Sequence, residues 1–351
     1  MTYIAKPKVH HPSLKANAIG LTRRDYEGTI TTLCAGCGHD SITAAIIQAF
    51  WELSIPPHKV AKLSGIGCSS KTPAYFLREA HGFNSVHGRM PAVATGANAA
   101  NGDLIMIGVS GDGDSLSIGL GQLCHAIRRN VNMLYVLENN GVYGLTKGQF
   151  SASADPGSTS KKGEANSMEA IDGVLLAMTL GATFVARSFS GDKAQLVPLI
   201  QAGLAHQGFA FIDVISPCVT FNDHEGSTKS YAYVKEHDEP SGEVNFVPFF
   251  EDITVEYDPG STTAVTMHDG SKLYLKKVAE EYNPTDKLAA MRLMHETHSR
   301  GEFATGILYI EPDKDDLLSQ LNLVDTPLAF LQADAVRPGR EVLDAVMEEH
   351  R

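Results

Sequence analysis

Short continuous runs of apolar residues recur along the first two thirds of the chain. Such runs are typical of strands that are buried on both faces, as in a parallel sheet. They lie at residues 60–63, 104–109, 132–137, 184–187 and 210–215, with a further strand candidate at Val86. Segments with helical spacing alternate with them, at residues 40–53, 92–101, 116–127 and 194–205. This alternation predicts an α/β fold, with a mostly parallel sheet and helices on both faces.

The pattern changes after about residue 235. Residues 236–243 are polar and acidic, as in a linker, and residues 286–298 have the spacing of a polar helix. Residues 1–30 show little periodicity. We therefore expect an N-terminal arm at residues 1–30, one α/β domain at residues 31–235 and a C-terminal extension at residues 236–351.

The overall composition narrows the functional class. The 351 residues are 43% hydrophobic, which is enough for a sizeable core, and the net charge of −12 argues against a nucleic-acid-binding protein. No apolar run reaches the length of about 18 residues that a membrane span needs, and residues 1–15 lack the apolar region of a secretory signal. We therefore expect a cytoplasmic protein, whose five cysteines stay reduced.

Two polar turns follow neighbouring predicted strands. Gly111-Asp112-Gly113-Asp114 follows one strand, and Asn139-Asn140 follows the next, about 25 residues later. Each turn alone is common turn chemistry, but parallel strands bring their carboxyl ends to the same edge, where ligands bind. Asp112 and Asn140 can supply oxygen ligands to a hard cation, and the glycines let the backbone approach a diphosphate. The pair therefore favours a metal and diphosphate site.

Four cysteines lie in predicted loops. Cys34 and Cys37 form a Cys-x-x-Cys motif, Cys68 follows a predicted strand, and Cys218 follows another. Four thiolates suit either a [4Fe–4S] cluster or structural zinc, and a Cys-x-x-Cys alone can be a redox dithiol. The residues by themselves leave these alternatives open. Cys124 lies in an apolar helical segment and is interpreted as a core residue.

The two turns match the thiamine-diphosphate motif. The wider text, from Gly111 to Gly121 and from Asn139 to Gln149, resembles the β subunit of 2-oxoacid:ferredoxin oxidoreductases. The resemblance covers about residues 31–222 and implies the diphosphate-binding type of thiamine-diphosphate fold. It implies Mg²⁺ held by Asp112, Asn140 and the backbone carbonyl of Val142, and a [4Fe–4S] cluster on Cys34, Cys37, Cys68 and Cys218. The implied cofactor contacts are Ile66, Gly67, Cys68, Ser69, His87, Gly113, Asp114, Gly144 and Leu145.

Two lysines are candidates for the reaction itself. An ammonium in a pocket can hold the carboxylate of a 2-oxoacid, and the resemblance singles out Lys71 and Lys147, although a solvated lysine is the ordinary interpretation. His39, next to Cys37, is given no role.

The resemblance implies CoA-dependent oxidative decarboxylation of a 2-oxoacid, with electrons passing through the cluster to ferredoxin. The long C-terminal region favours 2-oxoglutarate, which would yield succinyl-CoA and CO₂; pyruvate or a broad 2-oxoacid range is the alternative. An α subunit would supply the pyrimidine-binding and CoA-binding parts, in an αβ heterodimer or its dimer. Two other interpretations remain: a thiamine-dependent decarboxylase subunit without electron transfer, and a zinc-stabilised scaffold without activity.

Overall fold

The fold is built on one nine-stranded sheet, seen in a computed structural model that describes residues 13–158, 165–220, 251–267, 272–321, 323–337 and 339–351. The strand order is β2-β1-β3-β4-β8-β7-β11-β10-β9. The bounds are β1 Val60–Ser64, β2 His81–Asn84, β3 Ile105–Gly111, β4 Met133–Asn139, β7 Phe184–Phe189, β8 Phe209–Ile215, β9 Thr262–Thr266, β10 Lys272–Lys277 and β11 Glu302–Ile310. A short hairpin of β5 Val142–Tyr143 and β6 Gln149–Phe150 lies outside this sheet.

The six strands from β2 to β7 in this order are parallel to one another. Every residue of β1, β7 and β8 is buried, which explains why these strands read as continuous apolar runs. The predicted α/β class with a mostly parallel sheet is therefore confirmed. One strand lies elsewhere than expected: β2 precedes Val86, whose side chain is 71% exposed.

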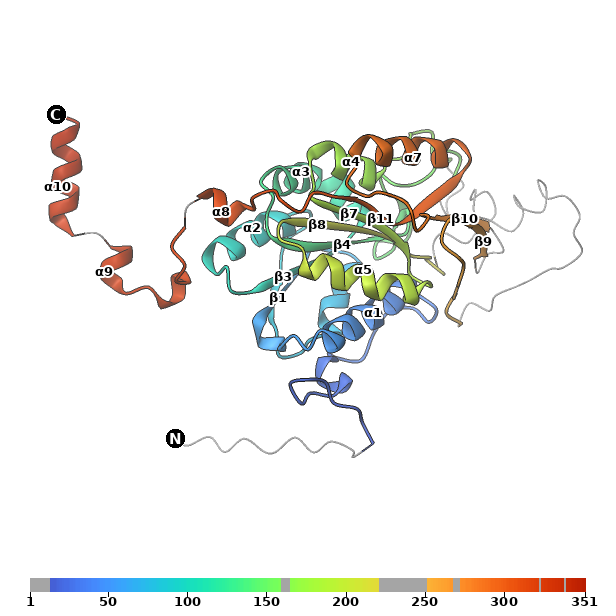
Figure 1. Cartoon of the computed structure of the whole chain (residues 1–351), viewed down its shortest axis with the longest axis horizontal. Helices are drawn as coiled ribbons and strands as arrows, with labels where there is room; N and C mark the ends of the chain where they lie inside the picture. The colour runs from blue at the N-terminus through green and yellow to red at the C-terminus, as the bar shows by residue number, and fades with distance from the viewer. Residues whose placement is uncertain (1–12, 159–164, 221–250, 268–271, 322, 338) are drawn as a thin grey trace, which may run out of the picture.

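Helices cover both faces of the sheet (Figure 1). One layer holds α1 Gly38–Glu52 and α5 Lys193–Ala205, and the other holds α2 Met90–Ala100, α3 Leu120–Arg128, α4 Gly173–Leu180 and α7 Lys287–Ser299. Each layer packs its own apolar core against the sheet. Each face of the sheet is thereby shielded from water, as a parallel sheet requires.

The chain beyond residue 250 returns to the same sheet. β11 pairs antiparallel with β7, β10 pairs parallel with β11, and β9 closes the edge antiparallel to β10. The region that we expected to be a C-terminal extension thus adds three strands to the sheet. The proposed boundaries at residues 30 and 235 stay predictions, and the linker at 236–243 lies outside the described residues.

The last 30 residues leave this body and stretch away from it (Figure 1). They follow α8 Leu317–Leu321 and contain the short 3-10 helix η5 Leu328–Phe330, α9 Ala333–Val336 and α10 Arg340–Glu349. No residue of α9 or α10 is buried. In the described part of the chain, no helix has the length and apolar character needed to cross a bilayer.

Candidate cofactor and cluster site

One edge of the sheet collects the predicted site residues, because the parallel strands all end there. A cavity of about 150 Å³ opens between the loops that follow β1, β2, β3 and β4. It is lined by every residue proposed to touch thiamine diphosphate or its metal: Ile66, Gly67, Cys68, Ser69, His87, Asp112, Gly113, Asp114, Asn140, Val142, Gly144 and Leu145. The structure thus brings these sequence positions together, while their individual roles stay predictions.

Asp112 lies just past the end of β3 and is 2% exposed. Two hydroxyl groups hold its side chain: Ser151 and Ser153 both donate hydrogen bonds to Oδ2, Ser153 at 2.7 Å. Burial raises the pKa of Asp112, and the two serine hydrogen bonds oppose that rise. A buried carboxylate with one oxygen fixed by hydroxyl donors is suited to present its other oxygen to a cation.

Asn140 lies one residue past the end of β4, and its amide orientation is fixed locally. The backbone N–H of Val142 donates to Oδ1 of Asn140 at 3.1 Å. Tyr143, in the same loop, donates from its hydroxyl to the carbonyl of Gly113 at 2.8 Å. A Cβ on Gly113 would lie 2.4 Å from the Tyr143 ring, so glycine is required at this approach. The loops after β3 and β4 are therefore packed tightly against each other.

Asp114 joins three loops through one buried carboxylate. Its Oδ1 accepts from His87 Nδ1, from the backbone N–H of Gly88 at 2.8 Å and from that of Ile66 at 3.4 Å. Its Oδ2 accepts from Ser110 at 2.7 Å. Asp114 lines the predicted cofactor cavity, but its carboxylate is engaged by the protein itself. His87, proposed as a cofactor contact, is oriented by this bond.

The four predicted cluster cysteines surround a second, smaller cavity of about 60 Å³. Cys34, Cys37, Cys68 and Cys218 all line it, and Cys124 does not. Burial raises the pKa of Cys37 and of Cys68. Among the described residues, no three His, Cys, Asp or Glu side chains stand close enough to form a ready metal cage. The four thiols thus share one cavity without forming a ready metal cage, and the cluster stays a prediction.

The two candidate lysines lie in different surroundings. Lys71 is half-buried and lines the cysteine cavity, and its backbone N–H donates to the carbonyl of Cys68 at 3.1 Å. Lys147 is exposed, lies on a turn with φ of 77°, and is not among the lining residues of either cavity. The structure thus places Lys71 with the other predicted site residues and leaves Lys147 outside them.

Two buried residues that the sequence did not single out lie between the cavities. His39 lines both, and Glu138 lines the cofactor cavity with 0% of its surface exposed. His39 Nδ1 lies 3.4 Å from Oε2 of Glu138, yet neither carboxylate oxygen has a hydrogen-bond partner there. Burial lowers the pKa of His39 to about 4 and raises that of Glu138 well above its ordinary value. Burial therefore disfavours the charged form of each side chain.

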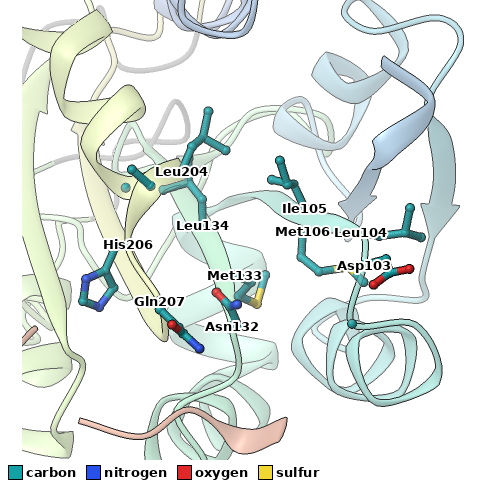
Figure 2. A pocket seen from close by; sticks show the side chains of 13 residues that line it. Asp103, Leu104, Ile105, Met106, Asn132, Met133, Leu134, Leu204, His206 and Gln207 are labelled. Atoms are coloured by element: carbon teal, nitrogen blue, oxygen red, sulfur yellow. The ribbon is translucent and has the colours of Figure 1, made fainter. Parts of the chain in front are cut away.

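A larger cavity lies at the opposite edge of the sheet. It measures about 210 Å³ and is formed where β3 and β4 begin and α5 ends. Figure 2 shows apolar and polar side chains around it, with His206 and Gln207 at one side and Asp103 at the other. His206 is engaged, because its Nε2 lies 2.7 Å from the Thr183 hydroxyl. The cavity carries none of the predicted site residues, so cavity size alone does not identify the functional site.

Comparisons with known proteins agree with this geometry. Residues 65–214 match the family described as thiamine pyrophosphate enzyme, C-terminal TPP binding domain. The 2-oxoglutarate synthase subunit KorB of Methanocaldococcus jannaschii is 36% identical over 212 residues, which cover 60% of this chain and 75% of that one. The 2-oxoacid:ferredoxin oxidoreductase subunit beta of a Sulfolobus species is 44% identical over 191 residues, covering 54% and 63%. The chain thus spans somewhat less than two thirds of the Sulfolobus relative.

A solved structure extends the likeness to nearly the whole chain. It is described as 2-oxoglutarate:ferredoxin oxidoreductase from Magnetococcus marinus with 2-oxoglutarate, coenzyme A and succinyl-CoA bound. The match has a TM-score of 0.72 and 29% sequence identity, and it covers 95% of this chain and 98% of that one. The similarity therefore includes the part of the chain that follows the thiamine-pyrophosphate-binding domain.

Proposed function

The chain belongs to the family of 2-oxoacid:ferredoxin oxidoreductase β subunits, and from this premise we propose that it catalyses, with an α subunit, the oxidative decarboxylation of 2-oxoglutarate. The products are succinyl-CoA and CO₂, and two electrons pass one at a time to ferredoxin in the cytoplasm. One observation carries the proposal: the cofactor cavity and the cysteine cavity adjoin. They share the lining residues His39, Cys68, Asn140 and Gly144.

Within the proposal, the chain's own residues bind and orient the cofactors. Asp112, Asn140 and the carbonyl of Val142 would hold Mg²⁺, which would supply positive charge for a diphosphate. The four cysteines around the smaller cavity hold a [4Fe–4S] cluster, for which four thiolates are the usual ligands. Thiamine diphosphate supplies the carbanion chemistry at the 2-oxo carbon, and the cluster accepts single electrons. Asp112 and Glu138 are themselves shielded from bulk water at this edge of the sheet.

Lys71 is proposed to bind the carboxylate of the 2-oxoacid. It lines the cysteine cavity, which adjoins the cofactor cavity. An ammonium at that place would neutralise the anionic substrate and fix its orientation. Lys147 is the second candidate, and its exposed turn near Gly144 would have to move toward the cofactor.

The choice of 2-oxoglutarate and of a partner rests on the relatives. The Magnetococcus structure has 2-oxoglutarate and succinyl-CoA bound, and its likeness covers 95% of this chain. The relatives are named as subunits, and the matched domain accounts for only one half of a thiamine-diphosphate site. An α subunit would supply the pyrimidine-binding and CoA-binding parts.

The test is reconstitution of this chain with an α subunit of the same family. The purified complex should reduce ferredoxin in the presence of 2-oxoglutarate and coenzyme A, with lower rates for pyruvate. The chain alone should be inactive with every 2-oxoacid. Activity of the chain alone, or a complex that turns over pyruvate and ignores 2-oxoglutarate, would contradict the proposal.

The cysteines distinguish the proposed function from that of a thiamine-dependent decarboxylase without electron transfer. Cys34→Ala should lose iron and ferredoxin reduction, because three protein thiolates hold a [4Fe–4S] cluster poorly. Cys124→Ala is the matched control, since Cys124 lines neither cavity. Zinc in place of iron in the wild-type complex, or equal iron in both variants, would favour the alternatives.

A further inference from the structure

We propose that His39 is a positioning residue that connects the two cofactor sites, with one ring nitrogen on each. In this arrangement Nε2 orients the metal-binding amide of Asn140, and Nδ1 anchors the loop that leads to Cys218. The inference rests on the proposed function, because it takes Asn140 as a metal ligand and Cys218 as a cluster ligand.

The position of His39 makes it a natural bridge. It is the second residue of α1 and follows Cys37 by two positions, so its backbone belongs to the Cys-x-x-Cys segment. Its side chain is 1% exposed and lines both the cofactor cavity and the cysteine cavity. The imidazole therefore lies in the wall between the two sites.

The hydrogen-bond partners determine which nitrogen carries the proton. The N–H of Val142 requires an acceptor, which assigns the oxygen of the Asn140 amide to that side at 3.1 Å. The Asn140 Nδ2, a donor, then faces His39 Nε2 at 3.4 Å. Nε2 must accept this bond, so the proton of the neutral ring is on Nδ1. Nδ1 lies 2.8 Å from the hydroxyl of Ser216.

Each of these contacts bears on a different site. The bond from Asn140 Nδ2 holds the amide so that Oδ1 stays on the side of Val142, where the metal would bind. Ser216 follows β8 directly and precedes Cys218 by two residues, and its backbone N–H donates to the carbonyl of Asn139 at 2.8 Å. One ring thus links the helix after Cys37, the loop before Cys218 and the metal-binding amide. Substitution of a side chain that orients a metal ligand typically lowers metal affinity 10- to 100-fold.

Two substitutions test the contacts of the two ring nitrogens of His39 separately. Asparagine places a polar atom close to the position of Nδ1, and glutamine places one close to the position of Nε2. His39→Asn should keep the Ser216 contact and lose the Asn140 contact, so the Kd for thiamine diphosphate at fixed Mg²⁺ should rise about 10-fold. Its iron content and reduced-cluster EPR spectrum should match the wild type.

His39→Gln should show the opposite pattern. It should keep the Asn140 contact, with a thiamine diphosphate Kd within about twofold of the wild type, and should alter the cluster EPR spectrum or lose iron faster in air. Both variants are measured in the αβ complex, by calorimetry, iron analysis and EPR. His125→Asn, a change on the exposed side of α3, is the control for histidine replacement in general.

The pattern across the variants decides the outcome. If both variants change both sites alike, or fail to fold, His39 is a packing residue and the link is overturned. If neither variant changes either site, the link is also overturned. A wild-type complex without iron overturns the proposed function together with the link, whereas a wild-type complex with its cluster and two indistinguishable variants overturns the link alone.

Discussion

Ser153→Ala is the sharpest test of how the proposed metal site is held. Ser153 donates from its hydroxyl to Oδ2 of Asp112 at 2.7 Å, and its Oγ also lies 2.9 Å from Oδ1 of Asn139, to which it can donate instead. Alanine removes the hydroxyl and leaves the backbone unchanged. Ser151 still donates to the same Asp112 oxygen. The variant therefore removes one of two supports of a buried carboxylate.

The expected magnitude follows from the burial of that carboxylate. A hydrogen bond to a charged group contributes roughly 1.5–3 kcal/mol, and loss of a group that orients a metal ligand costs about 10- to 100-fold in affinity. Because Asp112 is 2% exposed, water cannot replace the lost donor easily. Because Ser151 remains, we expect the lower end, about a 10-fold weaker Mg²⁺-dependent binding of thiamine diphosphate.

The assay is calorimetric titration of thiamine diphosphate into the αβ complex at several Mg²⁺ concentrations. Ser153→Thr keeps the hydroxyl and should bind close to the wild type. Ser299→Ala is a control, since that hydroxyl donates only to its own helix, at the carbonyl of Glu296. An unchanged affinity in Ser153→Ala would refute the reasoning, and equal losses in the alanine and threonine variants would assign the effect to packing.

Three further outcomes are expected. Asp112→Ala should lose Mg²⁺ and thiamine diphosphate together, at a cost of about 3 kcal/mol or more, as for one partner of a buried charge pair. Lys71→Met should raise the KM for the 2-oxoacid about 10- to 150-fold with cofactor content unchanged, and Lys147→Met should have a smaller effect. Lys62 is buried, which lowers its pKa to about 8 from 10.5, while its ammonium donates to the carbonyl of Phe76 at 2.6 Å. The unfolded chain therefore binds the extra proton between these two pH values, so stability should rise with pH there by roughly 3 kcal/mol, and Lys62→Met should lack this rise.

Each of these outcomes has a measurement that can contradict it. Wild-type cofactor affinity in the Asp112→Ala variant would contradict the proposed role of Asp112 as a metal ligand. Lys71→Met with unaltered KM and kcat/KM, or with lost thiamine diphosphate, would exclude a substrate contact. The transition temperatures of the wild type and of Lys62→Met, compared at pH 8 and pH 10, should diverge as the pH rises, and parallel curves would contradict the assigned pKa.

The sequence specified the central sheet more clearly than its edges. β1, β3, β4, β7 and β8 are buried strands, and their continuous apolar runs were enough to locate them in the sequence. β2 was missed because all four of its residues are exposed at the sheet edge, which leaves no apolar signal. β9 and β10 alternate exposed and buried residues over five or six positions, and they are separated from β8 by a long stretch. Their joining of the same sheet depends on tertiary pairing, which a local pattern does not contain.

The candidate site shows a similar division. The turns at Asp112 and Asn140 could be placed together because parallel strands end at one edge. His39 and Glu138 carried no spacing signal, although Glu138 is a charge at the end of an apolar run and could have been noticed for that reason. The exposed position of Lys147 depends on the conformation of its turn, which residue types alone do not determine.

The carboxylate of Asp114 fixes the loops that form part of the wall of the cofactor cavity. Its four hydrogen bonds, all to groups of the protein itself, tie the loops after β1 and β2 to the turn after β3. A Cβ on Gly65 would lie 1.7 Å from Oδ2 of Asp114, so only glycine at this position allows the loops to approach so closely. Loops that are already ordered lose little conformational entropy when a ligand enters. Much of the conformational entropy of these loops is thus lost when the chain folds. Cofactor binding therefore has to order this part of the cavity only slightly.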